Sequence, residues 1–211
     1  MGMAQASTTW TGERVRALPD DGLRYELVDG ELLVTPSPGW THQSAVAALF
    51  RRLDEYVGSN ALGWVRFAPA DLSLGEDEVL QPDLFVIPAA LNPRSWQEVR
   101  ALLLVIEVLS PGTARFDRLV KRRRYQRAPV PEYWIVDLDA RLVERWKPED
   151  TRPEILTEIL EWTPASGLKP LRLSCRASLR RCGGRGRGGT PAKNPSARPP
   201  VTVNERLSFR A

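Results

Sequence analysis

Residues 101–110 read ALLLVIEVLS, a run rich in Leu, Val and Ile that is apolar at both odd and even positions. This composition is typical of a central β-strand that is covered on both faces. Glu107 interrupts the run, and burial of an unpaired carboxylate is energetically costly. Either Glu107 has a partner that stabilises it within the sheet, or the segment is not a buried strand.

The flanking segments alternate between strand and helix patterns. Residues 25–35, YELVDGELLVT, predict a β-hairpin, because Asp29-Gly30 suits the positive φ angles of a type I′ turn. Apolar residues at helical spacing predict helices over residues 42–57 and 114–128. Further extended segments are predicted over residues 63–74, 80–88, 130–146 (two strands around a turn) and 154–162 (a strand or a short helix). The order predicts an α/β fold with a mixed central sheet flanked by helices and preceded by a hairpin.

The net charge of +4 comes from the C-terminal end of the 211-residue chain. From Arg172 onward there are ten basic residues and one acidic residue, whereas the rest has 20 basic and 25 acidic residues. Residues 1–171 are therefore predicted to form one domain, and residues 172–211 a disordered basic tail rich in Gly, Arg and Pro. The tail suits nucleic-acid binding, but its composition is also what GC-rich DNA encodes out of frame, with the native frame ending near Leu173.

Cysteine usage and hydropathy exclude several classes of protein. Cys175 and Cys182 have no nearby His or further Cys to complete a metal site, so neither is assigned a role. No window approaches the roughly 18 consecutive apolar residues of a membrane span, and the N-terminus lacks a secretory signal pattern. We expect a cytoplasmic protein with no membrane partner.

Two carboxylates occupy unusual places in neighbouring predicted strands. Asp83 precedes the apolar run LFVIP, and Glu107 lies inside the next strand. If the strands are adjacent, both carboxylates can reach one site and share a divalent cation, Mg²⁺ or Mn²⁺, that activates water for phosphodiester hydrolysis. Lys121, in the following helix, could stabilise the developing negative charge.

A structural interpretation of the same residues is also open. Asp83 could cap a turn after Pro82, and Glu107 could form a buried ion pair with an arginine. Asp117 and Lys121 are four residues apart on a helix, so Lys121 could belong to an exposed ion pair.

The motifs together resemble a known family. YELVDGEL, His42 at a helix start, QPDLFVI, IEVLSPGT, KRRRYQ and VPEYWIVD occur in the order seen in the Uma-two family of restriction endonucleases, within the PD-(D/E)XK nuclease superfamily. The resemblance covers about residues 18–146. It implies a restriction-endonuclease-like core in which Asp83 and Glu107 ligate Mg²⁺.

One position departs from the superfamily pattern. The superfamily lysine normally follows the acidic residue by two positions, where this chain has Leu109. The resemblance implies that Lys121 takes its place. Superfamily members often add an acidic residue from an early element; we favour Glu31 for that role over Glu26, which would then lie beside the site.

Two further features concern the surroundings of the site. His42, the only histidine, is either a helix-capping or surface residue or a neighbour of the metal ligands. The predicted helix over residues 114–128 is rich in Arg and Lys, and we call it the basic helix. It is either a solvated face or a surface for phosphate contacts, for which we single out Arg118, Arg122 and Arg124.

These observations predict a Mg²⁺-dependent endonuclease that hydrolyses DNA. The main alternative is a nuclease-like module that binds nucleic acid or a protein without cleaving it. A two-carboxylate glycosidase is less consistent with carboxylates in consecutive short strands followed by a lysine. A homodimer would suit cleavage of both strands of a duplex.

Overall fold

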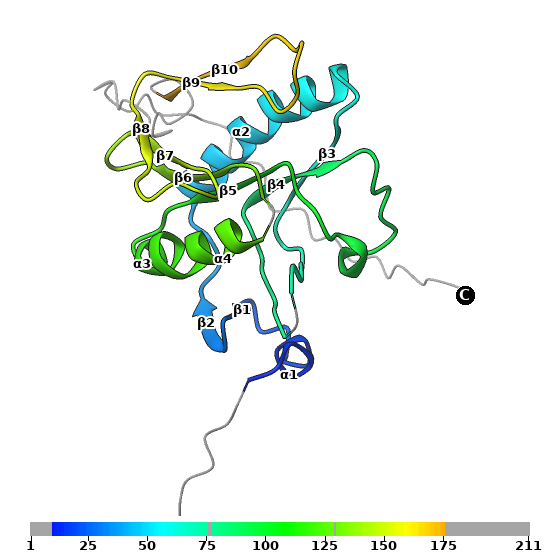
Figure 1. The fold of residues 1–211 in the computed structure, drawn as a ribbon. Helices are drawn as coiled ribbons and strands as arrows, with labels where there is room; N and C mark the ends of the chain where they lie inside the picture. Colours follow the sequence, from blue (N-terminus) through cyan, green and yellow to red (C-terminus); the bar gives the residue numbers. More distant parts are fainter. Residues whose placement is uncertain (1–9, 76, 129, 176–211) are drawn as a thin grey trace, which may run out of the picture.

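A six-stranded mixed sheet forms the centre of the molecule in a computed structural model, which describes residues 10–75, 77–128 and 130–175 (Figure 1). The strand order is β3-β4-β5-β6-β7-β8, and β5 and β6 are parallel while the other neighbours are antiparallel. The strands are β3 (Gly63–Phe67), β4 (Leu84–Pro88), β5 (Leu104–Val108), β6 (Tyr133–Asp137), β7 (Leu142–Trp146) and β8 (Glu154–Leu156).

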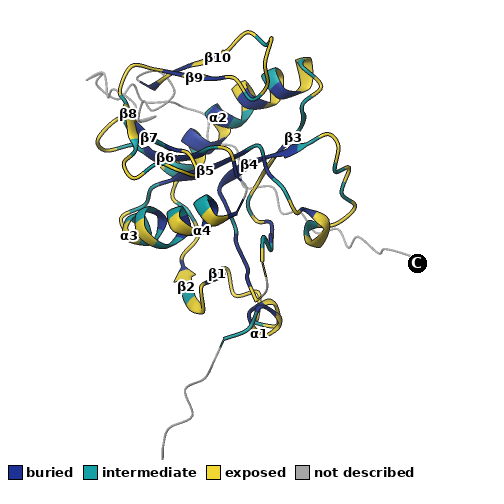
Figure 2. Cartoon of the chain, in the orientation of Figure 1, coloured by how far each residue is buried: buried dark blue, intermediate teal, exposed yellow. Residues whose placement is uncertain are grey.

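Strand β5 is the run that was predicted to be central. All five of its residues are buried, and it pairs with β4 on one side and β6 on the other (Figure 2). Leu104, Ile106 and Val108 belong to one apolar cluster, whereas Val105 belongs to a second cluster on the opposite face of the sheet. The absence of apolar–polar alternation in the sequence thus reflects burial on both faces.

Helices cover both faces of the sheet (Figure 1). Helix α2 (Trp40–Ser59) packs through Val46, Leu49 and Leu53 against one face, and it continues through Gly58, where the sequence predicted a stop. The opposite face is covered by a helical segment that consists of α3 (Ala114–Phe116), the π-helical η2 (Asp117–Lys121) and α4 (Arg122–Arg127).

The predicted hairpin is present as β1 (Arg24–Val28) and β2 (Glu31–Thr35). Its turn has φ angles of 51° at Asp29 and 80° at Gly30, as a type I′ turn requires. Leu27 exchanges two backbone hydrogen bonds with Val79, of 2.8 and 3.0 Å, which fasten the hairpin to the segment before β4. Two short helices, α1 (Gly12–Arg16) and the 3₁₀ helix η1 (Trp96–Glu98), complete the N-terminal half.

The C-terminal boundary predicted after Leu171 needs correction. Strand β10 (Leu171–Ser174) pairs with β9 (Ile159–Trp162), and Leu171, Leu173 and Cys175 are buried beside Trp162 in the α2-facing cluster. The alternating side chains of β10 thus belong to the folded domain. Residues 176–211, with Cys182 and most of the predicted basic tail, lie outside the described residues.

The segment over residues 154–162, predicted as one strand or a short helix, is two strands that serve different sheets. Strand β8 pairs with β7 at the edge of the central sheet, and β9 pairs with β10. Among the described helices, none combines the length and the apolarity that a membrane crossing requires.

Candidate active site

The ammonium group of Lys121 lies within a ring of buried carboxylates. Its Nζ is 2.8 Å from Glu26 Oε1, 2.9 Å from Glu107 Oε1 and 3.5 Å from Asp117 Oδ1. The lysine side chain is only 2% exposed. Glu26 comes from β1, Glu107 from β5, and Asp117 and Lys121 from the two ends of η2, so three separate elements converge at this point.

Asp83, immediately before β4, forms the second half of the site. Its Oδ1 is 3.0 Å from Arg24 Nη1, and its Oδ2 is 2.9 Å from both His42 Nε2 and the backbone nitrogen of Val108. The backbone N–H of Asp83 donates to Glu107 Oε2 at 3.3 Å, which joins the two halves. β4 and β5 therefore place the two predicted carboxylates next to each other.

Asp83 is held in its ionised form. Burial opposes ionisation, but the hydrogen bond and charge of His42, the charge of Arg24 and the N–H of Val108 lower the pKa of Asp83 to about 2. Asp83 therefore carries a negative charge at neutral pH.

The pKa values of Glu107 and Lys121 are both raised, but for different reasons. Burial raises the pKa of Glu107 well above its usual range; Lys121 opposes this rise, and the neighbouring carboxylates of Asp83, Asp117 and Glu26 add to it. Burial disfavours the charge on Lys121, but the surrounding carboxylates outweigh it and raise the pKa of the ammonium. Lys121 thus keeps its charge, whereas burial disfavours the ionised form of Glu107, which added positive charge would favour.

A cavity of about 280 Å³ opens onto these side chains. Asp83, Glu107 and Lys121 lie along it. Its walls include two loops: residues 36–39, between the hairpin and α2, and residues 110–113, between β5 and α3. The SPGT turn that ends the apolar run of β5 thus forms part of the wall of the site.

The charge balance of the site fits a divalent cation. The four carboxylates of Glu26, Asp83, Glu107 and Asp117 face two permanent cations, Lys121 and Arg24, so full ionisation leaves an excess of negative charge. Asp83 and Glu107 supply the hard oxygen ligands that Mg²⁺ prefers, and Mg²⁺ is usually held by one or two carboxylates plus waters. In the described ranges, no group of three or more His, Cys, Asp or Glu side chains is arranged to hold a metal unaided.

The predicted site residues divide into two groups in space. Asp83, Glu107, Lys121, His42 and Glu26 lie together around the cavity. The interpretation of Lys121 as part of an exposed ion pair is wrong, because its partners are buried with it. The partner of Glu107 is this lysine, where an arginine was the alternative.

Glu31, which the sequence favoured over Glu26, lies elsewhere. It is exposed on β2 and lines a separate hollow beside Arg115 and Phe116. Glu26 instead accepts a 2.8 Å hydrogen bond from the backbone N–H of Gln81, which directs its carboxylate inward. The register of the hairpin pairs Glu26 with Leu33 and Glu31 with Val28, so the two glutamates share a face. Glu31 lies next to the turn, outside the carboxylate cavity, whereas Glu26 lies within it.

The three arginines proposed for DNA contacts already have protein partners. Arg118 is 2.6 Å from Glu144 and 2.9 Å from Asp137. Arg122 donates to Gln126 and lies 4.6 Å above the ring of Trp146. Arg124 is buried and forms an ion pair with Glu78. Arg118 and Arg122 remain partly exposed, whereas Arg124 is too buried to contact a phosphate.

Sequence reasoning missed two residues of the site. Arg24 lies two positions before Glu26 on β1, and strand alternation could have placed both on one face. Asp117 was noted only as a helical neighbour of Lys121, whereas it is buried and burial raises its pKa against the opposing effect of Lys121. The spacing in the sequence could not show that the turn between them is π-helical.

Comparisons with known proteins agree with this architecture. The family model Uma2, described as "Putative restriction endonuclease", matches residues 13–174. A crystal structure described as that of a "putative nuclease belonging to DUF820" from Anabaena variabilis has a TM-score of 0.67 and 19% sequence identity, over 80% of this chain and 97% of that chain. No curated protein matches. The predicted fold class and the predicted family are confirmed.

Proposed function

The chain belongs to the Uma2 family of restriction-endonuclease-like proteins, and from this membership we propose that it is a divalent-metal-dependent endonuclease that hydrolyses DNA phosphodiester bonds. Asp83 and Glu107 would hold the cation, which is Mg²⁺ or Mn²⁺. Lys121 would act beside them, and Glu26 takes the role for which the sequence favoured Glu31.

The proposal rests on the position of Lys121. Lys121 comes from the helix after β5, yet its Nζ is 2.9 Å from Glu107 in a cavity that Asp83 also lines. The strand itself has Leu109 where the superfamily pattern has a lysine. A buried lysine from another element that reaches the same carboxylate supports a working site, since a purely structural sheet has little use for so many buried charges.

The residues have distinct proposed tasks. Asp83 is ionised at neutral pH and is oriented by Arg24, His42 and the Val108 N–H, so it is ready to act as a ligand. When bound, the cation would activate a water molecule and stabilise charge on the scissile phosphodiester. That added positive charge would favour the ionised form of Glu107, which burial disfavours.

Lys121 keeps its proton and offers a fixed positive charge at the floor of the cavity. In that position it would stabilise negative charge that develops on the phosphate or orient the attacking water. Glu26 and Asp117 would hold the ammonium in place, 2.8 and 3.5 Å from Nζ. They are positioning residues, because they act through the lysine.

A plasmid-nicking assay tests the proposal. Supercoiled DNA is incubated with the protein and Mg²⁺ or Mn²⁺, and conversion to open circles is followed for the wild type, Asp83→Asn and Glu107→Gln. We expect nicking by the wild type to be lost in both variants and abolished by EDTA. Asp54→Asn, on the exposed face of α2, is the matched control and should nick as the wild type does.

Two results would contradict the proposal. Nicking that survives in Asp83→Asn would place the chemistry elsewhere or in a contaminant. Cation binding by a wild type that nicks no DNA would favour the alternative of a nuclease-like binding module.

A further inference from the structure

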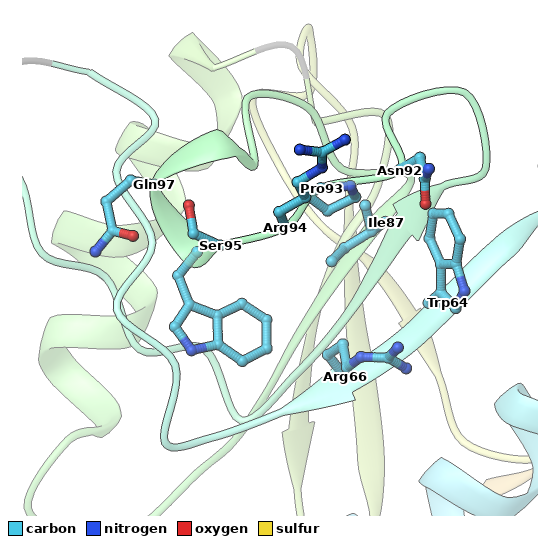
Figure 3. A pocket seen from close by; sticks show the side chains of 9 residues that line it. Trp64, Arg66, Ile87, Asn92, Pro93, Arg94, Ser95 and Gln97 are labelled. Atoms are coloured by element: carbon cyan, nitrogen blue, oxygen red, sulfur yellow. The ribbon is translucent and has the colours of Figure 1, made fainter.

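A second cavity, of about 450 Å³, lies at the β3 edge of the central sheet, away from the carboxylates (Figure 3). Strand β3 contributes Trp64 and Arg66, β4 contributes Ile87, and the loop and turn after β4 contribute Asn92, Arg94 and Trp96. We call it the edge cavity. Its volume lies within the range of about 300–1,000 Å³ that is usual for small-molecule sites, which is sufficient for a nucleotide.

The edge cavity has positive charge that the protein does not neutralise. Arg66 and Arg94 are both exposed, and neither guanidinium forms an ion pair with a carboxylate within the described residues. Arg66 donates to the carbonyl of its neighbour Val65, at 2.8 Å. The nearby carboxylate of Glu98 accepts from the backbone N–H of Arg94, at 2.8 Å, and so stabilises the turn. This contrasts with Arg118 and Arg124, which have acidic partners.

Two tryptophans add flat apolar surface to the same cavity. Trp64 and Trp96 are half-buried and both line it. Trp96 is fixed from behind by an edge-to-face contact with Phe85, with ring centroids 6.1 Å apart. An aromatic ring beside a free guanidinium is the combination that binds single-stranded nucleic acid, because the ring stacks with a base and the cation pairs with a phosphate.

The edge cavity and the carboxylate site lie on one face of the sheet. Trp64 pairs with Ile87 and Arg66 with Phe85, so these side chains project to the same side. Asp83, Phe85 and Ile87 are alternate residues along the chain, and alternate side chains of a strand point to one face. All three therefore lie on that face. Asp83 and Ile87 are four steps apart along the chain, which is about 13 Å at the usual rise of a strand. A bound strand of a few nucleotides is therefore long enough to reach both places.

We propose that the edge cavity binds one unpaired nucleotide of the nucleic-acid strand on which the carboxylate site acts, with its base against Trp96 or Trp64 and its phosphate at Arg66 and Arg94. This inference rests on the proposed function for the identity of the ligand. Asn92 and Gln97, which also line the cavity, supply amide groups that can hydrogen-bond to the edge of a base. The edge cavity would thus supply nucleic-acid contacts apart from those predicted for the basic helix.

Fluorescence anisotropy tests the inference independently of cleavage. The wild type is titrated in EDTA onto a fluorescein-labelled single-stranded oligodeoxynucleotide of roughly 12 nucleotides. We expect Arg66→Gln/Arg94→Gln to weaken binding by at least about tenfold, and to reduce the slope of log K against log salt by about 0.7 for each phosphate that is no longer neutralised. Trp96→Leu retains an apolar side chain beside Phe85 and should weaken binding by about tenfold, because the base can no longer stack.

The matched control is Arg51→Gln, an exposed arginine on α2 on the opposite face of the sheet, which should bind as the wild type does. Thermal unfolding of each variant verifies that it is folded. An unlabelled duplex of the same sequence should compete less well than the single strand, because its bases are already stacked.

The outcomes separate this inference from the proposed function. Wild-type affinity in the double arginine variant and in Trp96→Leu, or no binding of the oligonucleotide by the wild type, would overturn the edge cavity as a nucleotide site. Nicking that depends on Asp83, combined with unchanged binding by these variants, would overturn this inference alone. If binding depends on the edge cavity but the protein does not nick DNA, the proposed function would be overturned and the edge cavity would remain a nucleotide site.

Discussion

The positive charge of Lys121 offsets the mutual repulsion of three buried carboxylates. Glu26, Glu107 and Asp117 all lie within 3.5 Å of its Nζ, and all four side chains are at most 3% exposed. Removal of one partner from a buried ion pair typically costs about 3–5 kcal/mol, because the remaining charges stay buried without compensation. A substitution of Lys121 is therefore expected to affect folding as well as the proposed chemistry.

The first prediction follows from this arrangement. Lys121→Met should lower the free energy of unfolding by about 3–5 kcal/mol at neutral pH, as measured by urea denaturation. The double variant Lys121→Met/Glu107→Gln should recover part of that loss, because it removes one of the uncompensated carboxylates. Equal stability of Lys121→Met and the wild type would show that the lysine is not buried among these groups.

The second prediction concerns Glu107 alone. Because the pKa of Glu107 is raised in the folded protein, its contribution to stability is fully present below its ordinary pKa and is lost as the pH rises through the raised value. Glu107→Gln removes this pH-dependent loss. Without added metal, the variant should gain stability relative to the wild type by about 1 kcal/mol or more between pH 4 and pH 8.

Denaturation curves at several pH values in EDTA measure this difference. A gap that stays constant with pH, or a variant that loses stability relative to the wild type as the pH rises, would mean that Glu107 is already compensated in the metal-free protein. The expected result is a residue that costs stability and is kept for function.

The third prediction compares two glutamates of one hairpin. Glu26→Gln should reduce the initial rate of plasmid nicking by at least about tenfold, because the ammonium of Lys121 loses a partner at 2.8 Å. Glu31→Gln should nick at the wild-type rate, because Glu31 is exposed outside the carboxylate cavity. The reverse order of the two rates would restore the sequence-based assignment of Glu31.

At the scale of elements, η2 determines how the helix reaches the site. Its π-helical turn brings Asp117 and Lys121 inward together, and the Asp117 carbonyl accepts a 3.2 Å hydrogen bond from the buried hydroxyl of Tyr133. Such wide turns are rare and occur frequently at functional sites. The sequence predicted a helix over this segment, but the pattern of apolar residues has no distinct signature for a single π-helical turn.

The fourth prediction concerns α4 and its attachment to the loop before β4. Arg124 is buried and forms an ion pair with Glu78, and its Nη2 is 2.8 Å from Oε2. Arg124→Met should lower the free energy of unfolding by about 3–5 kcal/mol, because Glu78 would remain buried and unpaired. Arg123→Met, at an exposed position on the same helix, should change it by no more than about 0.5 kcal/mol.

Urea denaturation measures the stability, and anisotropy with labelled DNA measures the affinity of the folded fraction. We expect Arg124→Met to lose stability while its folded fraction keeps the wild-type affinity for DNA. Loss of DNA affinity with unchanged stability would instead support the sequence-based assignment of this arginine to phosphate contacts.

At the scale of the whole molecule, the elements with strong local signals could be predicted from the sequence. The apolar run of β5, the Asp29-Gly30 turn and the periodicity of α2 each specify their structure through neighbouring residues. The division of residues 154–162 between β8 and β9 could not be predicted in this way, because it depends on which distant strand each half pairs with. The same holds for β10, whose alternation is short and lies next to the basic tail.

The candidate site could be predicted in part for a similar reason. Asp83 and Glu107 are conspicuous because Asp83 stands at the start of one apolar strand and Glu107 interrupts another. The choice of Glu26 over Glu31 depends on the backbone pairing of Leu27 with Val79, which no local pattern shows. The partners of Arg118 and Arg124 are likewise distant in sequence, so the basic run alone could not show that these two arginines form ion pairs within the protein.

Calorimetric titration of the metal-free protein with Mn²⁺ is the sharpest test of the proposal that Asp83 and Glu107 together hold a divalent cation. We predict saturable binding by the wild type that is lost in Asp83→Asn and in Glu107→Gln, and retained in Asp54→Asn. Undiminished Mn²⁺ binding by the first two variants would contradict the proposal.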